Sequence, residues 1–194
     1  MAISDALPAP DRAARREHHG KQGSNGVRIR LHGQAAQIAF GRRIAKYLRP
    51  PYTLYLRGDL GTGKTTLARG ILRGLGYTGP VRSPTYTLLE PYELGAMCLY
   101  HLDLYRLGDP EELEYLGLRD LLDGRSLLLV EWPERGRGAL PASDMTIRIE
   151  HAGEARSLDL TAHRAHAVGC WKRTCALLSD VENLRYLGWQ KARL

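Results

Sequence analysis

Alternation of hydrophobic and polar side chains predicts β-structure at both ends of the central part of the chain. Residues 27–31 alternate between apolar and charged positions, which is the pattern of a strand with one buried face. Residues 146–150 and 157–161 alternate in the same way around Gly153, so we expect an antiparallel pair joined by a turn. The continuous apolar run at 126–130 instead predicts a strand that is buried on both faces of a sheet.

Two stretches carry the spacing of amphipathic helices. Residues 34–48 place six apolar side chains on roughly one face, and the proline pair at 50–51 ends this predicted helix. Residues 65–75 predict a second helix, which follows a short apolar strand at 53–56. Strands interleaved with helices predict an α/β domain, in which helices flank a mostly parallel sheet that carries the antiparallel pair near its end.

The middle of the chain gives weaker signals. Residues 81–91 predict a polar loop that leads into a strand, and residues 97–105 predict a further strand. Asp109 followed by Pro110 and two acidic residues is typical of a helix start, with Asp109 as the N-cap. Residues 118–122 predict another short helix.

Composition divides the chain of 194 residues into three parts. Residues 1–26 are rich in Ala, Pro, Arg, Gly and Ser without apolar periodicity, so we expect a disordered leader. Residues 27–161 hold the periodic segments and form the predicted domain. Residues 162–194 carry six basic and two acidic side chains, a net +4 of the chain's +7, and we expect a basic extension that is partly helical.

Charge and cysteine usage narrow the class of protein. Three cysteines without a CxxC pair, and an N-terminus without the apolar core of a secretory signal, favour a cytoplasmic protein. No apolar run approaches the roughly 20 residues that a membrane-spanning helix needs, so we expect no membrane partner. The basic extension suggests contact with RNA or with an acidic protein, although solvated tails are the commoner case.

A zinc site in the basic extension is disfavoured. His163, His166, Cys170 and Cys175 have the spacing H-x2-H-x3-C-x4-C, which is not a usual zinc-knuckle pattern. An amphipathic helix with these side chains on its face explains the spacing better.

The strongest motif is a phosphate-binding loop at residues 58–65, Gly-Asp-Leu-Gly-Thr-Gly-Lys-Thr, between the predicted strand and helix. Its glycines let backbone N–H groups approach phosphate oxygens, and the helix N-terminus adds partial positive charge. Lys64 would reach the terminal phosphates of ATP, and Thr65 would bind Mg²⁺. The nucleotide-binding residues that the motif predicts are Asp59, Leu60, Gly61, Thr62, Gly63, Lys64, Thr65 and Thr66.

Two apolar segments end in a carboxylate, Asp103 in one and Glu131 in the other. In phosphate-loop proteins such a carboxylate completes the magnesium shell or orients the attacking water. We favour Glu131 for the metal, because its strand is of the more deeply buried type, and Asp103 for the water. The alternative that either carboxylate only pairs with Arg106 or Arg135 stays open. The predicted catalytic set is therefore Lys64 with these two acids.

Two further features lie close to these carboxylates along the chain. Trp132 follows Glu131 directly, and it either lines the nucleotide pocket or packs in the core. Ser83, Thr85 and Thr87 form a polar loop downstream of the phosphate loop, where many such proteins place the element that senses the γ-phosphate. Ser-Pro-Thr is also a common turn, so this signal is weak alone.

Taken together, these segments resemble one protein family, TsaE (YjeE), over residues 27–161. The matching segments occur in family order and are GDLGTGKTT at 58–66, SPTYTL at 83–88, YHLDLYRL at 100–107, DPEELE at 109–114 and LVEWPE at 129–134. The leader and the basic extension are longer than in a typical member.

The resemblance implies an ATPase with a P-loop α/β fold. That enzyme would support formation of N6-threonylcarbamoyladenosine (t6A) at position 37 of tRNAs that read ANN codons. It implies that Thr65 and Glu131 hold Mg²⁺, that Asp103 is needed for hydrolysis, that Trp132 neighbours the nucleotide, and that the loop at 83–87 acts as a switch. It further implies a slow ATPase that acts with the TsaB–TsaD complex, which itself transfers threonylcarbamoyl to tRNA.

Two other functions use the same motif. A small-molecule kinase would also need Lys64, Thr65 and a carboxylate, together with a lid for which Arg135 and Arg137 are the available arginines. A non-catalytic switch would bind ATP only to order a surface. A GTPase is disfavoured because the chain has no Asn-Lys-x-Asp run.

Overall fold

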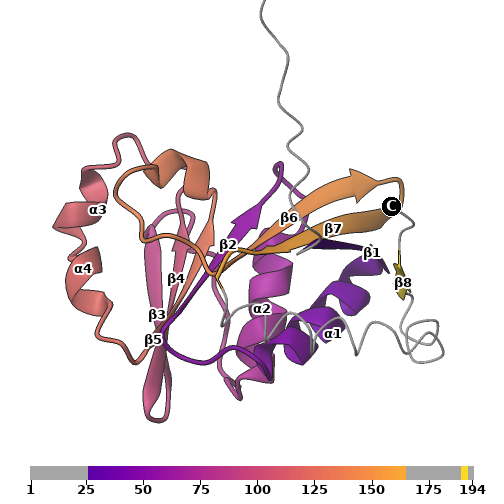
Figure 1. The fold of residues 1–194 in the computed structure, drawn as a ribbon, viewed down its shortest axis with the longest axis horizontal. Coiled ribbons are helices and arrows are strands. Elements are labelled where there is room, and N and C mark those ends of the chain that lie inside the picture. The colour runs from indigo at the N-terminus through magenta and orange to yellow at the C-terminus, as the bar shows by residue number, and fades with distance from the viewer. Residues whose placement is uncertain (1–25, 165–188, 192–194) are drawn as a thin grey trace, which may run out of the picture.

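The structure, a computed structural model, describes residues 26–164 and 189–191. These residues form one eight-stranded sheet with the order β3-β4-β5-β2-β6-β7-β1-β8 (Figure 1). The predicted disordered leader and the predicted helix of the basic extension fall on 1–25 and 165–188, outside the described residues.

The described elements follow the predicted order along the chain. The strands are β1 (Gly26–His32), β2 (Tyr52–Arg57), β3 (Leu89–Leu94), β4 (Met97–Asp103), β5 (Ser126–Glu131), β6 (Met145–Ala152), β7 (Ala155–Ala162) and β8 (Trp189–Lys191). The helices are α1 (Gly33–Ala45), α2 (Lys64–Gly74), α3 (Glu112–Tyr115), α4 (Leu118–Leu121) and the 3₁₀ turn η1 (Pro133–Gly136). The strand β8, which pairs antiparallel with β1, was not predicted.

The sheet is mixed, and its parallel part is confined to the centre. Strand β5 pairs parallel with β4 and β2, and β2 pairs parallel with β6. The remaining neighbours, β3 with β4, β6 with β7, and β1 with β7 and β8, are antiparallel. The predicted hairpin of β6 and β7 is confirmed, and Gly153 makes its turn with a φ of 66°. The parallel centre matters most, because it brings the carboxyl ends of β2, β4 and β5 to one edge.

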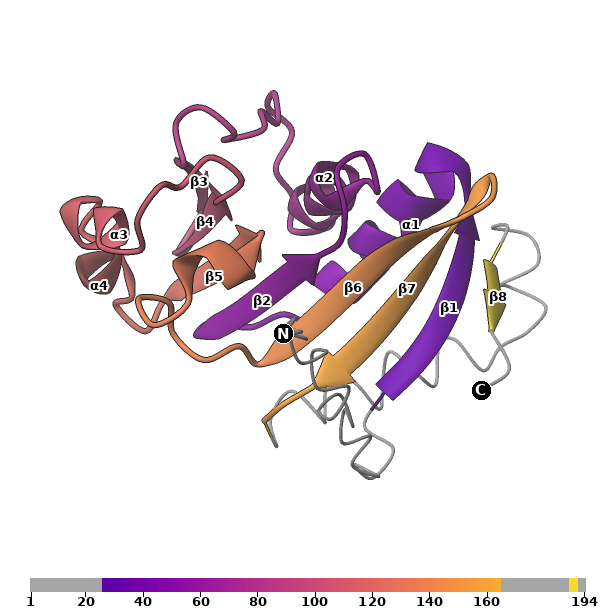
Figure 2. The same cartoon turned by 90° about the horizontal axis from the view of Figure 1, so that it is seen from above.

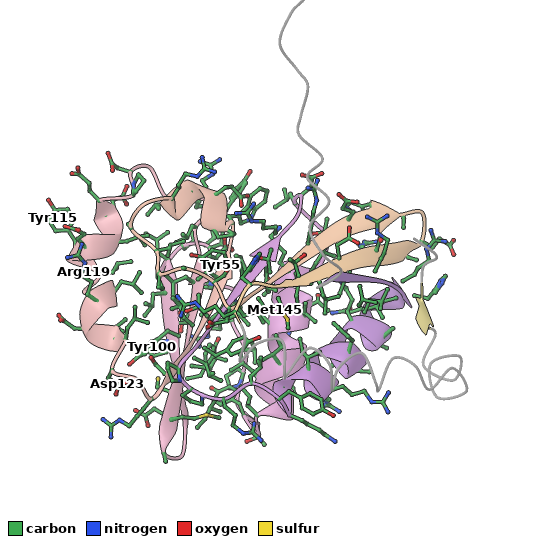
Figure 3. The ribbon with its side chains drawn as sticks, viewed as in Figure 1. Tyr55, Tyr100, Tyr115, Arg119, Asp123 and Met145 are labelled. Atoms are coloured by element: carbon green, nitrogen blue, oxygen red, sulfur yellow. The ribbon has the colours of Figure 1, made fainter. Side chains whose placement is uncertain are left out.

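Each face of the sheet carries a layer of apolar side chains, over different strands. Helices α1 and α2 pack side by side on one face of β2, β6, β7 and β1 (Figure 2). The buried apolar residues of that face include Phe40, Leu67 and Ile147. The other face of β4 and β5 is covered by the segment that contains α3, α4 and η1, through residues such as Leu113 and Val130. Tyr115 and Arg119 mark the outer end of this second layer (Figure 3).

Two helix boundaries differ from prediction. Helix α1 ends at Ala45 instead of residue 48, although Leu48 remains buried. Asp109 does not serve as the N-cap of α3, which begins at Glu112. Its carboxylate instead accepts a hydrogen bond from the Glu111 N–H at 2.9 Å, which shapes the preceding turn.

None of the helices in the part of the chain that the structure describes is long and apolar enough to cross a membrane.

Candidate functional site: a phosphate loop beside two strand-end carboxylates

The phosphate loop connects β2 to α2, as its motif requires. Gly63 precedes α2 with a φ of 96°, a conformation that residues with a Cβ rarely adopt. A Cβ at this position would also lie 2.4 Å from Gln37 Oε1. Gln37, buried on α1, donates from Nε2 to Thr62 O at 3.0 Å, so α1 directly fixes the backbone of the loop.

Lys64 is folded back over its own loop. Its Nζ donates hydrogen bonds to the carbonyls of Gly58 and Asp59, at 2.7 and 2.8 Å. The same nitrogen lies 4.1 Å from the centroid of the Trp132 ring. Burial lowers the pKa of Lys64 from its usual value, while the carboxylates of Glu131 and Asp103 oppose that shift. The ammonium is therefore short of solvent and close to both predicted acids.

Asp103 and Glu131 end neighbouring parallel strands and are register partners between β4 and β5. Both residues are buried, with exposed fractions of 4% and 2%. Adjacent parallel strands present their carboxyl ends at the same edge, so the topology converts a separation of 28 residues in sequence into direct proximity.

Glu131 connects the sheet to the phosphate loop. Its Oε2 accepts a hydrogen bond from the Thr65 hydroxyl at 3.2 Å. Its Oε1 lies 2.9 Å from Nε2 of His101, a residue of β4 whose side chain is fully buried. Glu131 and Thr65 thus place two hard oxygen ligands together, which suits Mg²⁺, a cation that usually keeps several water ligands. Among the described residues, no group of three or more His, Cys, Asp or Glu side chains forms a metal site.

Asp103 connects the sheet to the polar loop. Its Oδ2 accepts a hydrogen bond from the Thr85 hydroxyl at 2.7 Å, and the Ser83 hydroxyl lies 3.5 Å from the same oxygen. Its Oδ1 accepts the backbone N–H of Tyr105 at 3.1 Å. In addition, the Asp103 N–H donates to the carbonyl of Leu88 at 3.1 Å. The loop and the carboxylate are therefore held by both side-chain and backbone contacts.

Trp132 adopts a left-handed backbone conformation directly after Glu131, with φ 56° and ψ 48°. Its N–H donates to the Leu56 carbonyl at 3.3 Å, which ties it to the end of β2. Its ring lies 5.1 Å from that of Tyr105 and faces Lys64. A residue with a Cβ pays for this conformation, so the surrounding contacts must hold Trp132 in place.

These groups line one concave pocket with a volume of about 340 Å³. Its lining residues are Leu60, Gly61, Gly63, Lys64, Thr65, Thr66, Ser83, Thr85, Asp103, Tyr105, Glu131 and Trp132. Of the residues predicted from the sequence, Asp59 and Thr62 do not line it. The Thr62 side chain is turned inward, where its hydroxyl donates to Asp59 O at 2.9 Å.

A second hollow of about 260 Å³ shares Gly61, Gly63 and Thr66 with the pocket and continues past α1. Its other lining residues are Gly33, Gln34, Gln37, Glu154 and Arg156. Sequence reasoning missed these residues, and it also missed His101 and Tyr105. Of these residues, only His101 and Tyr105 could have been found from the sequence, because both lie within the family-like segment at 100–107.

A family model described as "Threonylcarbamoyl adenosine biosynthesis protein TsaE" matches residues 31–158. The chain belongs to the TsaE family. The match spans the phosphate loop, both strand-end carboxylates and Trp132, whereas 1–30 and 159–194 lie outside it.

Named TsaE proteins show the same likeness. The tRNA threonylcarbamoyladenosine biosynthesis protein TsaE of Haemophilus influenzae is 47% identical over 132 residues, which cover 66% of this chain and 84% of that protein. The Bacillus subtilis protein of the same name is 41% identical over 125 residues, covering 64% and 78%. The crystal structure of Bacillus subtilis YdiB superposes with a TM-score of 0.65 at 31% identity, over 81% of this chain and 97% of that one. The predicted P-loop α/β fold of this TsaE-family chain is thereby confirmed.

Proposed function

We propose that this TsaE-family chain is a Mg²⁺-dependent ATPase. It would support t6A formation at position 37 of ANN-decoding tRNAs, acting in the cytoplasm with the TsaB–TsaD complex. The observation that carries the proposal is the single pocket in which the phosphate loop, Lys64 and Thr65 meet the carboxylates of Asp103 and Glu131. The names of the TsaE relatives support the tRNA modification, and the pocket supports the nucleotide chemistry.

Each residue has a distinct role in the proposed reaction. The loop amides and Lys64 bind the phosphates, and Lys64 neutralises charge on the terminal ones. Thr65 and Glu131 hold Mg²⁺, which when bound offsets the negative charge of the transferring phosphoryl group. The contact between Thr65 and Glu131 favours this assignment over one in which Asp103 binds the metal.

Asp103 orients the attacking water in this proposal. Its carboxylate already accepts hydrogen bonds from Thr85 in the loop at 83–87 and from the Tyr105 amide, so both of its oxygens are held. A shift of the loop at 83–87 would change how Asp103 is held, which is how this loop would act as a switch.

The second hollow suits the ribose and base. It shares Gly61, Gly63 and Thr66 with the pocket, and neither Asp103 nor Glu131 lines it. A nucleotide whose terminal phosphates lie at Lys64 would therefore extend its base toward Gln34, Gln37 and Arg156.

Two exposed side chains make the phosphate loop and the switch-like loop suitable for a partner. Leu60 is 69% exposed in the first, and Tyr86 is 81% exposed in the second. A partner that contacts these two loops would lie directly beside the proposed site of hydrolysis. In this proposal the isolated chain is a slow ATPase, and the TsaB–TsaD complex stimulates it. Contact with tRNA would then be indirect, or made by the basic extension.

The deciding experiment measures ATP hydrolysis by the purified chain alone, with TsaB–TsaD, and with TsaB–TsaD plus substrate tRNA. We expect slow turnover alone, stimulation by the complex, and multiple rounds of t6A formation only when this chain and ATP are both present. The Lys64→Met variant serves as the inactive control.

Two results would contradict the proposal. A phosphorylated small molecule formed without TsaB–TsaD would favour a kinase. Full support of t6A formation by an Asp103→Asn variant that no longer hydrolyses ATP would favour a non-catalytic switch.

A further inference from the structure

A buried histidine lies one residue pair deeper in the sheet than the two carboxylates. His101 pairs in register with Leu129, as Asp103 pairs with Glu131, so His101 and Glu131 are diagonal neighbours on the same face of β4 and β5. The His101 side chain has no exposed surface, and Nε2 lies 2.9 Å from Glu131 Oε1. A histidine inside an apolar strand usually needs a polar partner, and here the partner is a proposed metal ligand.

The hydrogen bonds available to His101 assign its tautomer. An ionised carboxylate only accepts hydrogen bonds, so the proton of this contact resides on Nε2. Nδ1 is buried and has no hydrogen-bond partner among the described residues. A proton on Nδ1 would leave a buried N–H without an acceptor, which is costly. The contact therefore has Nε2–H donating to Oε1 of Glu131.

This contact divides the two oxygens of Glu131 between two partners. His101 occupies Oε1, while Oε2 faces the hydroxyl of Thr65 at 3.2 Å. Two contacts at different oxygens fix both the rotamer and the plane of the carboxylate. Without His101, Oε1 would face an apolar strand interior, and the carboxylate would gain alternative orientations away from Thr65.

We propose that His101 is a positioning residue for the magnesium site, which holds Glu131 so that Oε2 is directed at the cation beside Thr65. The inference rests on the proposed function, because it needs Mg²⁺ to bind at Thr65 and Glu131. Residues that orient metal ligands in this way typically change metal affinity 10- to 100-fold when they are replaced. His101 itself does not line the pocket.

The test compares His101→Leu with His101→Gln in the full chain. Calorimetry measures binding of a non-hydrolysable ATP analogue without metal and then during a titration with Mg²⁺. We expect about 10- to 100-fold weaker Mg²⁺ affinity in His101→Leu, with metal-free nucleotide affinity within about twofold of the parental value. In His101→Gln the amide nitrogen replaces Nε2 as the donor, so most of the Mg²⁺ affinity should return.

Leu99→Ala is the matched control, because Leu99 is buried on the same face of β4, and its removal disturbs packing without touching Glu131. It should lower the temperature of unfolding while leaving Mg²⁺ affinity unchanged. Parental Mg²⁺ affinity in His101→Leu, or an equal loss in His101→Gln, would overturn the inference. If the parental chain itself binds no nucleotide, the proposed function fails first, and that outcome is distinct.

A measurement on the unaltered chain covers the case in which His101→Leu does not fold. Imidazole nitrogen–proton correlation spectra report which ring nitrogen carries the proton. We expect the Nε2–H tautomer for the buried histidine, and a resonance of this ring that shifts when Mg²⁺ is added to the nucleotide complex. An Nδ1–H tautomer would overturn the inference.

Discussion

The ammonium nitrogen of Lys64 lies 4.1 Å from the centroid of the Trp132 ring and, in the same position, donates to the carbonyls of Gly58 and Asp59. The lysine therefore has three partners, all within its own site. A bound triphosphate would replace at least some of these contacts with bonds to phosphate, in which both partners are charged and which are therefore stronger than bonds to neutral carbonyls. This exchange links nucleotide binding to the surroundings of one tryptophan.

Replacement of Lys64 by methionine separates its role in binding from its role in folding. The variant should lose about 10- to 100-fold in ATP affinity, since hydrogen bonds to charged groups contribute roughly 1.5–3 kcal/mol. Its thermal stability should not fall in proportion, because burial already disfavours the ammonium and lowers its pKa. Calorimetry measures the ATP affinity, and thermal unfolding measures the stability. The exposed Lys46→Met variant is the control, and equal ATP affinity in Lys64→Met and the parental chain would contradict the assignment.

Trp132 should report nucleotide binding through its fluorescence. When phosphate draws Lys64 away, the indole loses a cation at its face, and such contacts contribute about 0.5–2 kcal/mol. We expect a change in emission on addition of an ATP analogue with Mg²⁺. The chain has two other tryptophans, so the Trp132→Phe variant is required, and the change should vanish in it. A change that persists in Trp132→Phe would show that the signal comes from elsewhere.

Replacement of Asp103 should impair hydrolysis, whereas replacement of Glu131 should impair Mg²⁺ binding. Asp103→Asn keeps the shape of the side chain but weakens its ability to orient and accept a proton from water, so hydrolysis should slow by about 100-fold or more. Nucleotide and Mg²⁺ affinity should change only a few-fold. Glu131→Gln should instead raise the Mg²⁺ concentration needed for nucleotide binding. It should have little effect on nucleotide affinity when a chelator removes the metal. Single-turnover hydrolysis and metal titrations measure the two effects, and an exchange of the two patterns would assign Asp103 to the metal.

The elements that carry the candidate site were predicted best where one short motif specifies local geometry. The phosphate loop, the two strands that end in Asp103 and Glu131, and the polar loop with Ser83 and Thr85 all lie where their patterns indicated. Each of these predictions used only neighbours in sequence. The order of strands β4-β5-β2, which brings the acids next to each other, depends on long-range packing that no short pattern encodes.

The residues that sequence reasoning missed depend on that same packing. His101 lies in an apolar strand, where a histidine is most simply interpreted as a core residue, and its link to Glu131 follows only from the register of β4 and β5. Gln37 and Arg156 come from α1 and β7, which lie near opposite ends of the domain's sequence. They meet the phosphate loop only because α1 and the β6–β7 hairpin lie beside it.

Helix α1 packs closely against α2, the helix that follows the phosphate loop, and this packing depends on glycine. A Cβ at Gly41 would lie 2.7 Å from Leu67 O and 2.8 Å from Ile71 N, both backbone atoms of α2. Gly41→Ala should therefore lower the free energy of unfolding by about 1–2 kcal/mol, because overpacking outweighs the gain in helix propensity. Denaturant unfolding measures this, with Arg42→Ala on the exposed face of α1 as the control. A stabilised Gly41→Ala variant would mean that the helices can separate freely.

Tyr55 should make stability depend on pH in the alkaline range. Its hydroxyl donates to the carbonyl of Pro141, and burial raises its pKa to about 12, with Arg57 opposing the shift. The ordinary tyrosine pKa is about 10, so between pH 10 and 12 the unfolded chain loses this proton while the folded chain keeps it. The unfolded state then binds fewer protons, and the free energy of unfolding falls as pH rises.

The size of this effect follows from the shift, at about 1.4 kcal/mol for each pH unit between the two pKa values. In Tyr55→Phe the term is absent, so the parental chain should lose roughly 2 kcal/mol relative to the variant between pH 9 and pH 12. The lost hydrogen bond to Pro141 adds only an offset that does not vary with pH. Urea unfolding at a series of pH values measures the difference. Tyr115→Phe, at a side chain that is 89% exposed, should give a curve parallel to the parental one. Parallel curves for Tyr55→Phe and the parental chain would instead mean that Tyr55 ionises as easily in the folded protein as in water.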